Sequence, residues 1–117
     1  MKVLYHDGCD DGFGAAYAIW LKHGYQAEYI PVQHGQPFPD VSFGETVYVV
    51  DFSYPRDILQ SVAARCKLVV LDHHKTAMDD LVDLPFAHFD MNKSGAVLAW
   101  EYFHPNKPIP LLLEYVQ

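Results

Sequence analysis

The sequence has little cysteine, little basic charge and no long apolar run. Its two cysteines are too few for a disulfide scaffold. Eight Lys and Arg residues against 15 Asp and Glu give a net charge of −7, which disfavours nonspecific binding to DNA or RNA, so double-stranded nucleic acid is not an expected partner. No stretch approaches the roughly 20 apolar residues of a membrane span, and the first residues lack the long apolar region of a signal peptide. A cytoplasmic location without a membrane partner is therefore expected.

The chain also has no internal repeat, low-complexity tract or block of like charge. Its 117 residues, 50% of them hydrophobic, suffice for one domain with its own core but not for two. Apolar runs alternate with segments of helical periodicity, which predicts an α/β fold: a mostly parallel, Rossmann-like sheet of about 4–5 strands with helices on both faces. Strands are expected at 2–5, 27–32, 46–50, 67–71 and 85–89, helices at 12–22, 55–65 and 94–103, a short helix or loop at 75–84, and a last helical segment within 110–117.

Acidic and imidazole side chains follow three of these expected strands. Because the carboxyl ends of parallel strands meet at one edge of a sheet, where ligands bind in open α/β folds, we expect these side chains to converge. Asp51 follows 46–50, and Asp72, His73 and His74 follow 67–71. The first strand ends at His6, followed by Asp7, Cys9, Asp10 and Asp11.

This mixture of ligands predicts a metal site. Carboxylate oxygens suit hard divalent cations, and imidazole shifts the preference toward manganese and its neighbours. One or two Mn²⁺ ions are expected, with Mg²⁺ or Co²⁺ as alternatives, and a pair would lie roughly 3.5–4 Å apart. Such a site suits hydrolysis of phosphate esters, because it acidifies a bound water and neutralises phosphoryl charge. The expected metal ligands are His6, Asp11, Asp51, Asp72 and His73.

The same residues resemble the DHH phosphoesterases, a family named for its Asp-His-His triplet. The triplet itself is 72–74, and Asp51 at the end of an apolar strand resembles the second motif of the family. The segment 94–100 is similar to the one that opens the helix after the triplet. The first motif is matched by Tyr5, His6, Cys9, Asp11, Gly12, Phe13, Ala15 and Ala16.

The resemblance implies an Mn-dependent phosphodiesterase or exonuclease-like hydrolase. Its substrates would be short oligonucleotides, single-stranded nucleic-acid ends or cyclic dinucleotides, attacked in line by an activated water. Asp72, His73 and His74 would be the catalytic residues. For His74, the roles of metal ligand, support for a ligand and phosphate contact stay open. Gly12, Ser94 and Gly95, at two expected helix starts, would also contact substrate phosphate.

Two departures from the family leave alternatives open. Cys9 stands where many members have an Asp, and Asp7 or Asp10 could replace that ligand. By resemblance the 117 residues are the N-terminal part of a DHH domain, and a fourth motif and a C-terminal substrate domain would follow in a longer protein. The alternatives are therefore a catalytically incomplete metal-binding fragment or interaction module, and a hydrolase of another class such as an amidohydrolase.

Several other polar residues are expected to have structural roles. The histidines at 23, 34, 88 and 104 should lie away from the strand-end edge, at the surface or in structural positions. Asp90 should cap the following helix or make an outer contact to the site. Cys66, between a helix and a strand, should be a reduced core thiol.

Overall fold

The sheet is built from five short, apolar strands, and a computed structural model describes it within residues 1–114. All neighbouring strands are parallel, in the order β2-β1-β3-β4-β5. The sheet therefore reverses its winding between β1 and β3, the place where ligands bind in doubly wound folds. The strands are β1 (Lys2–His6), β2 (Glu28–Val32), β3 (Thr46–Val50), β4 (Lys67–Asp72) and β5 (Ala87–Phe89).

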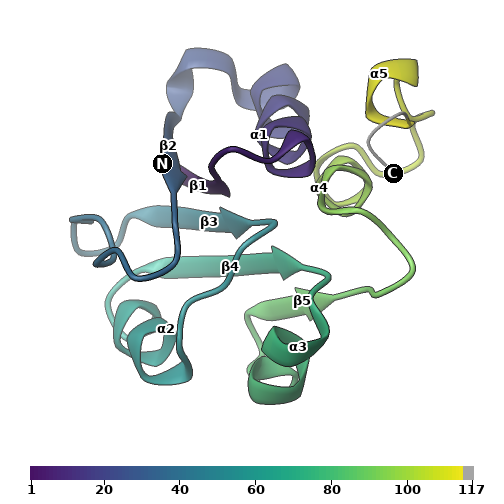
Figure 1. Ribbon diagram of the computed structural model, residues 1–117. Helices are drawn as coiled ribbons and strands as arrows, with labels where there is room; N and C mark the ends of the chain where they lie inside the picture. Colours follow the sequence, from purple (N-terminus) through teal and green to yellow (C-terminus); the bar gives the residue numbers. More distant parts are fainter. Residues whose placement is uncertain (115–117) are drawn as a thin grey trace.

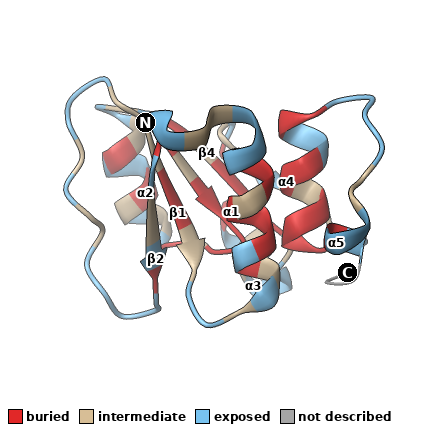
Figure 2. Cartoon of the chain, turned by 90° about the horizontal axis from the view of Figure 1, so that it is seen from above, coloured by how far each residue is buried: buried red, intermediate tan, exposed pale blue. Residues whose placement is uncertain are grey.

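Helices cover both faces of the sheet. Figure 1 shows α1 (Asp10–His23) and α4 (Gly95–Phe103) on one face, and α2 (Arg56–Ala63) and α3 (Lys75–Leu81) on the other. A 3₁₀ turn at Gly24–Gln26 follows α1, and α5 (Leu111–Glu114) lies beyond α4. Seen from above, α1 and α4 run side by side over the strands (Figure 2). Their amino ends both lie at the carboxyl edge of the sheet, because each follows directly on a loop from a strand end.

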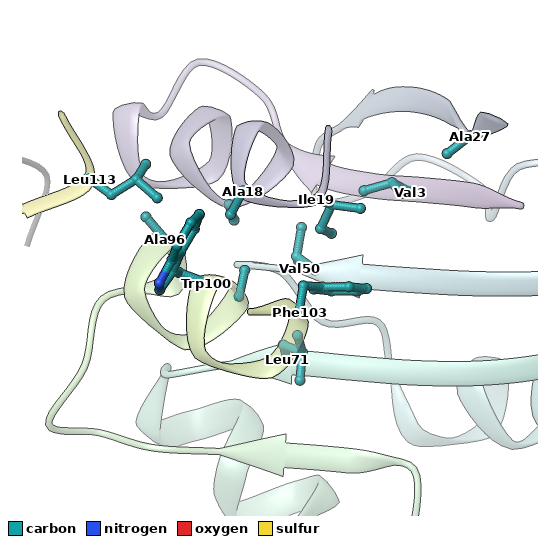
Figure 3. Packing of buried hydrophobic residues seen from close by; sticks show 12 residues of the cluster. Val3, Ala18, Ile19, Ala27, Val50, Leu71, Ala96, Trp100, Phe103 and Leu113 are labelled. Carbon is teal, nitrogen blue, oxygen red and sulfur yellow. The ribbon is translucent and has the colours of Figure 1, made fainter. Parts of the chain in front are cut away.

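The strands are buried on both faces, which explains their continuous apolar runs. Val3, Val50 and Leu71 point toward α1 and α4, where Ile19, Trp100 and Phe103 complete the core (Figure 3). The alternate residues Leu4, Val49 and Val70 face α2 and α3 with Leu59 and Val62. Small residues of α1 and α4, namely Ala15, Ala18, Ala96 and Ala99, let these two helices approach closely. This packing fixes the two helix starts relative to the strand ends.

The α/β fold, the parallel sheet and the helices on both faces are confirmed. Pro31 lies in the edge strand β2, as expected for a residue without an amide hydrogen. The first helix begins at Asp10, two residues before the expected start, because two acidic residues in its first turn suit the positive end of a helix. Of the helical segment predicted within 110–117, only α5 is described, and residues 115–117 lie outside the described part. Within residues 1–114, no helix is long and apolar enough to cross a membrane.

Candidate metal centre

Asp51 lies at the centre of the strand-end edge, directly after β3. Its side chain is 1% exposed, and its backbone has a φ of 54°, a left-handed conformation that costs energy in a residue other than glycine. The amide of Asp51 donates to the carbonyl of Leu71, which continues the pairing of β3 with β4. The carboxylate is packed so closely on Gly95 that a Cβ added to Gly95 would lie 2.6 Å from Oδ1. The fold thus holds a buried acid at the switch point of the sheet.

His73 joins Asp51 to Asp11. Its Nε2 lies 2.8 Å from Oδ1 of Asp51 and 3.1 Å from Oδ2 of Asp11. One imidazole nitrogen therefore contacts two carboxylates from different parts of the fold, the loop after β3 and the start of α1. A proton on Nε2 can make a good hydrogen bond to only one of the two carboxylates. The arrangement brings three side chains that can bind a metal, those of His73, Asp51 and Asp11, within hydrogen-bond distance of one another through this nitrogen.

Asp11 is fixed by the amino end of α4. Its Oδ2 accepts from the amide of Gly95 at 2.8 Å, and its Oδ1 accepts from the amide of Ala96 at 2.7 Å. These N–H groups have no partner within their own helix, and they stabilise a negative charge. Ser94 caps the same helix, because its Oγ accepts from the amide of Val97. The start of α4 therefore positions a carboxylate of α1.

Asp72, the last residue of β4, is fully buried and has three partners. Its Oδ1 accepts from the amide of His73 at 2.8 Å and lies 2.6 Å from Nδ1 of His74. Its Oδ2 accepts from Oγ of Ser53 at 2.8 Å. Since Nδ1 of His74 is engaged by Asp72, its Nε2 is the nitrogen left for a further partner. The His74 side chain is 49% exposed, so that nitrogen is accessible.

His6 and Cys9 approach Asp51 from β1 and the loop after it. His6 Nδ1 lies 3.9 Å from Oδ2 of Asp51, and the Cys9 thiol donates to the same oxygen at 3.5 Å. Burial, together with the nearby Asp51 charge, raises the pKa of Cys9 despite hydrogen bonds from the backbone of Asp11 and Gly12. The thiol form is therefore favoured. Asp7 and Asp10, the two other acids of this motif, are exposed and lie outside the cluster.

Gly12, Ser94 and Gly95 have contacts within the protein where substrate phosphate was expected. Gly12 is buried, and a Cβ on Gly12 would overlap the carbonyl of His6. The Gly95 amide donates to Asp11, and the hydroxyl of Ser94 is used by the helix cap. The Gly95 amide is therefore already engaged, whereas the O–H of Ser94, whose oxygen only accepts in the cap, is still a donor. A phosphate contact by these three residues stays a prediction.

The donor set fits a hard or borderline divalent cation. Ligand atoms of Asp51, Asp72, His73 and His74 lie within 4.8 Å of one another, as do those of His6, Cys9 and Asp51, so the two groups share Asp51. Burial and the negative charge of Asp11 raise the pKa of Asp51, and His73 opposes that rise only in part. Among the described residues, the ion pairs of Lys and Arg side chains go to Glu45, Asp79, Asp83, Asp90 and Glu101, away from this cluster. A cation would supply the missing positive charge.

The prediction that His34 lies away from this edge is wrong. It lines a pocket of about 230 Å³ together with His6, Ser53, Asp72 and His74. The signal was present in the sequence, because His34 follows the end of β2 by two residues and obeys the strand-end rule that identified the other sites. The other histidines do lie elsewhere: His104 is buried against Trp100, His23 packs on Phe103, and His88 is exposed on β5.

Asp90 and Cys66 are held by local contacts. Asp90 Oδ1 accepts from the amide of Asn92, and its other oxygen pairs with Lys93, so it stabilises the turn after β5 and does not cap α4. Cys66 is a free, half-buried thiol that donates to the carbonyl of Ser42.

Ser53 was not identified from the sequence. Its hydroxyl orients Asp72, and the only sequence signal is its place two residues after Asp51.

Comparison with known proteins supports the fold and gives no activity. No protein-family model matches the sequence. The chain is 38% identical over 133 aligned residues to an uncharacterized protein of Acanthamoeba polyphaga mimivirus, an alignment that covers 98% of the chain and 32% of the relative. The chain thus spans about a third of the length of that curated relative. A crystal structure of an uncharacterized protein from Helicobacter pylori G27 has a TM-score of 0.71 at 12% identity, covering 92% of this chain and 37% of that one. At that identity the likeness shows the fold alone.

Proposed function

We propose that this domain is a metal-dependent phosphoesterase that hydrolyses phosphodiester bonds. The observation that carries the proposal is the convergence of Asp51, Asp72 and His73 at the switch point of the sheet, without a Lys or Arg partner among the described residues. Asp11 lies outside this group of ligand atoms but reaches Nε2 of His73 at 3.1 Å. Carboxylates brought together without counter-charge are costly in a metal-free protein and useful in a metal site. The ordered resemblance to the three DHH motifs supports the same reading.

In this proposal, one set of residues binds the cation and another contacts the substrate. Asp11, Asp51, Asp72 and His73 would hold one or two Mn²⁺ ions, with His6 as a further ligand beside Asp51. Bound metal would acidify a water and neutralise phosphoryl charge. Mg²⁺ or Co²⁺ are alternatives that the ligand types also accept. The −7 net charge of the chain does not oppose an anionic substrate once cations invert the local charge.

His74 would contact the phosphoryl oxygens. Asp72 holds its Nδ1 at 2.6 Å, which fixes the ring and leaves Nε2 to donate toward the pocket. Ser53 in turn holds the other oxygen of Asp72. This chain of contacts from Ser53 to His74 would orient a donor for the phosphate. Substrates of the proposed class are short oligonucleotides, single-stranded nucleic-acid ends and cyclic dinucleotides. A cytoplasmic location is part of the proposal and rests on the sequence alone.

The test is hydrolysis of bis-p-nitrophenyl phosphate by the purified chain, with and without Mn²⁺. Asp72→Asn removes a buried ligand charge. Asp90→Asn is the matched control, because Asp90 follows the neighbouring strand at the same edge but pairs with Lys93. We expect Mn²⁺-dependent turnover that falls at least roughly 100-fold in Asp72→Asn and is kept in Asp90→Asn. Equal turnover in Asp72→Asn would contradict the assigned centre.

Two other results would favour the alternative functions. Turnover of amides with inert phosphodiesters and phosphomonoesters would indicate an amidohydrolase. An Mn²⁺-induced rise in melting temperature without turnover of any ester would indicate a metal-binding module that lacks part of the catalytic machinery.

A further inference from the structure

A pocket of about 230 Å³ opens beside the metal centre, on the side of the sheet covered by α3. Its lining combines imidazoles and hydroxyls with one buried carboxylate, which belongs to the centre itself. The last residues of β1 and β4, the loops after β2, β3 and β4, and the start of α3 contribute to it. The lining residues are His6, His34, Ser53, Asp72, His74, Thr76 and Ala77. A space of this size, bounded by potential hydrogen-bond donors and adjoining the cluster, suits a phosphoryl group.

Of the three histidines in this lining, His34 is the one that belongs to neither group of potential metal ligands. It comes from the loop between β2 and β3, and its ring stacks on Phe52 with 4.4 Å between ring centroids and an interplanar angle of 26°. Phe52 is 2% exposed, so it offers a fixed platform. The edge of the His34 ring meets His6, with centroids 5.8 Å apart. The imidazole is thus held in place by its faces and edges while remaining exposed to solvent.

The ring nitrogens of His34 have no hydrogen-bond partner among the residues that the structure describes. The loop itself is anchored through its neighbour, since the Gln33 amide group donates to the carbonyl of Asp7 and the Gln33 backbone donates to Gln36. His34 belongs to neither group of ligand atoms that could share a cation. A positioned imidazole with free nitrogens, lining the pocket beside the cluster of Asp51, Asp72 and His73, has the features of a substrate contact.

We propose that His34 binds the phosphodiester substrate by donating a hydrogen bond from its imidazole N–H to a non-bridging phosphoryl oxygen. The proposal rests on the proposed phosphoesterase function, which it deepens by naming a residue that recognises the phosphoryl group. His74 would donate from the β4 side of the pocket and His34 from the β2 side. The phosphoryl group would then be held between two imidazoles and the metal centre.

Three single substitutions test this contact. His34→Phe keeps an aromatic ring to stack on Phe52 but removes the N–H donor. His34→Gln keeps an N–H donor and loses the stacked ring. His88→Phe is the matched control, because His88 is an exposed histidine that also packs on an aromatic ring, Tyr102, and does not line the pocket. Since His34 and His88 are both exposed, all three variants should fold, which circular dichroism can verify.

The readout is the split between KM and kcat for bis-p-nitrophenyl phosphate with Mn²⁺. A lost hydrogen bond to a charged oxygen predicts that His34→Phe raises KM by roughly 10- to 100-fold, with kcat changed less than about threefold. His34→Gln should recover a measurable part of that loss, and His88→Phe should match the wild type. An unchanged KM in His34→Phe, with an active wild type, would overturn the role of His34 and leave the proposed function standing.

A second measurement keeps the inference testable if the wild type does not turn over this ester. Inorganic phosphate can be titrated into the Mg²⁺-loaded protein and followed by the nitrogen-15 resonances of the histidine rings. Phosphate binding that His34→Phe weakens and His88→Phe does not would support the contact. Absence of phosphate binding to the wild type would overturn it together with the proposed function.

Discussion

Gly95 is the residue whose substitution most directly tests the packing behind the metal centre. A Cβ placed there would lie 2.6 Å from Oδ1, 2.7 Å from Cβ and 2.8 Å from Cγ of Asp51, closer than the 3.4 Å at which ordinary contact begins. Asp51 has little room to yield, because its side chain is buried and its amide is bonded to β4. Gly95→Ala must therefore displace the carboxylate, the start of α4, or both.

The expected cost follows from overpacking. Forcing an extra carbon into a packed site costs about 1–3 kcal/mol, and the better helix propensity of alanine returns at most about 1 kcal/mol. Because three atoms of Asp51 lie closer than 3.0 Å, we expect the upper half of that cost and a net loss of about 1–2 kcal/mol. For a chain of this length such a loss lowers the melting temperature by roughly 3–10 °C. Because the displaced group is a proposed metal ligand, the proposal also predicts a smaller stabilisation by Mn²⁺ in Gly95→Ala than in the wild type. Thermal unfolding followed by circular dichroism, with and without Mn²⁺, measures both effects.

A second substitution, at Asp51, tests whether the loss of stability in Gly95→Ala comes from the clash with the Asp51 side chain. Asp51→Gly removes all three clashing atoms and suits the left-handed φ at that position. In the Asp51→Gly background, Gly95→Ala should therefore cost much less than in the wild type. If Gly95→Ala is harmless in the wild type and leaves the Mn²⁺ response intact, the close packing of Asp51 on α4 is refuted.

Three further predictions concern stability. Ser94→Ala removes the cap at the Val97 amide and should cost about 1 kcal/mol in urea unfolding; no loss would contradict the cap. Tyr54 has a buried hydroxyl without a partner among the described residues and a pKa raised to about 12 by burial, so Tyr54→Phe should leave stability unchanged or increase it by up to about 1 kcal/mol. The Ser42 amide and Lys2 lower the pKa of Glu45 below 4.5, so its ionised form stabilises the fold above that pH. Glu45→Gln should therefore lower the melting temperature at pH 7 but not below the folded pKa.

Much of the fold was predictable because its strands are apolar on both faces. The runs at β3 and β4 are buried by helices above and below, so they stand out in the sequence, and the parallel sheet follows from their alternation with helices. The same reasoning placed Asp51 and Asp72 at one edge, since each closes such a run. The predicted helix ends differ from the observed ones by one or two residues. The first helix, for example, begins at Asp10 and not at Gly12, because several neighbouring polar residues could each start it.

The contacts that organise the site could not be predicted, because they join residues distant in sequence. Asp11 accepts from the start of α4, 84 and 85 residues further along the chain, and no local pattern identifies that pair. His34 was assigned to the wrong place because β2 is an edge strand followed by a loop rich in Pro and Gly, so its end looked like loop rather than a strand end. Its position depends on stacking with Phe52, which only the folded structure shows.

The most direct test of the metal centre is Mn²⁺ binding followed by electron paramagnetic resonance, because free Mn²⁺ gives a six-line signal that weakens when the ion is bound. The proposed function predicts that the wild type removes one or two equivalents of Mn²⁺ from solution. It also predicts that Asp72→Asn lowers the affinity for Mn²⁺ at least roughly tenfold and that Asp90→Asn does not. An undiminished free-ion signal with wild-type protein, or equal binding by Asp72→Asn, would contradict the assignment of these carboxylates to a metal site.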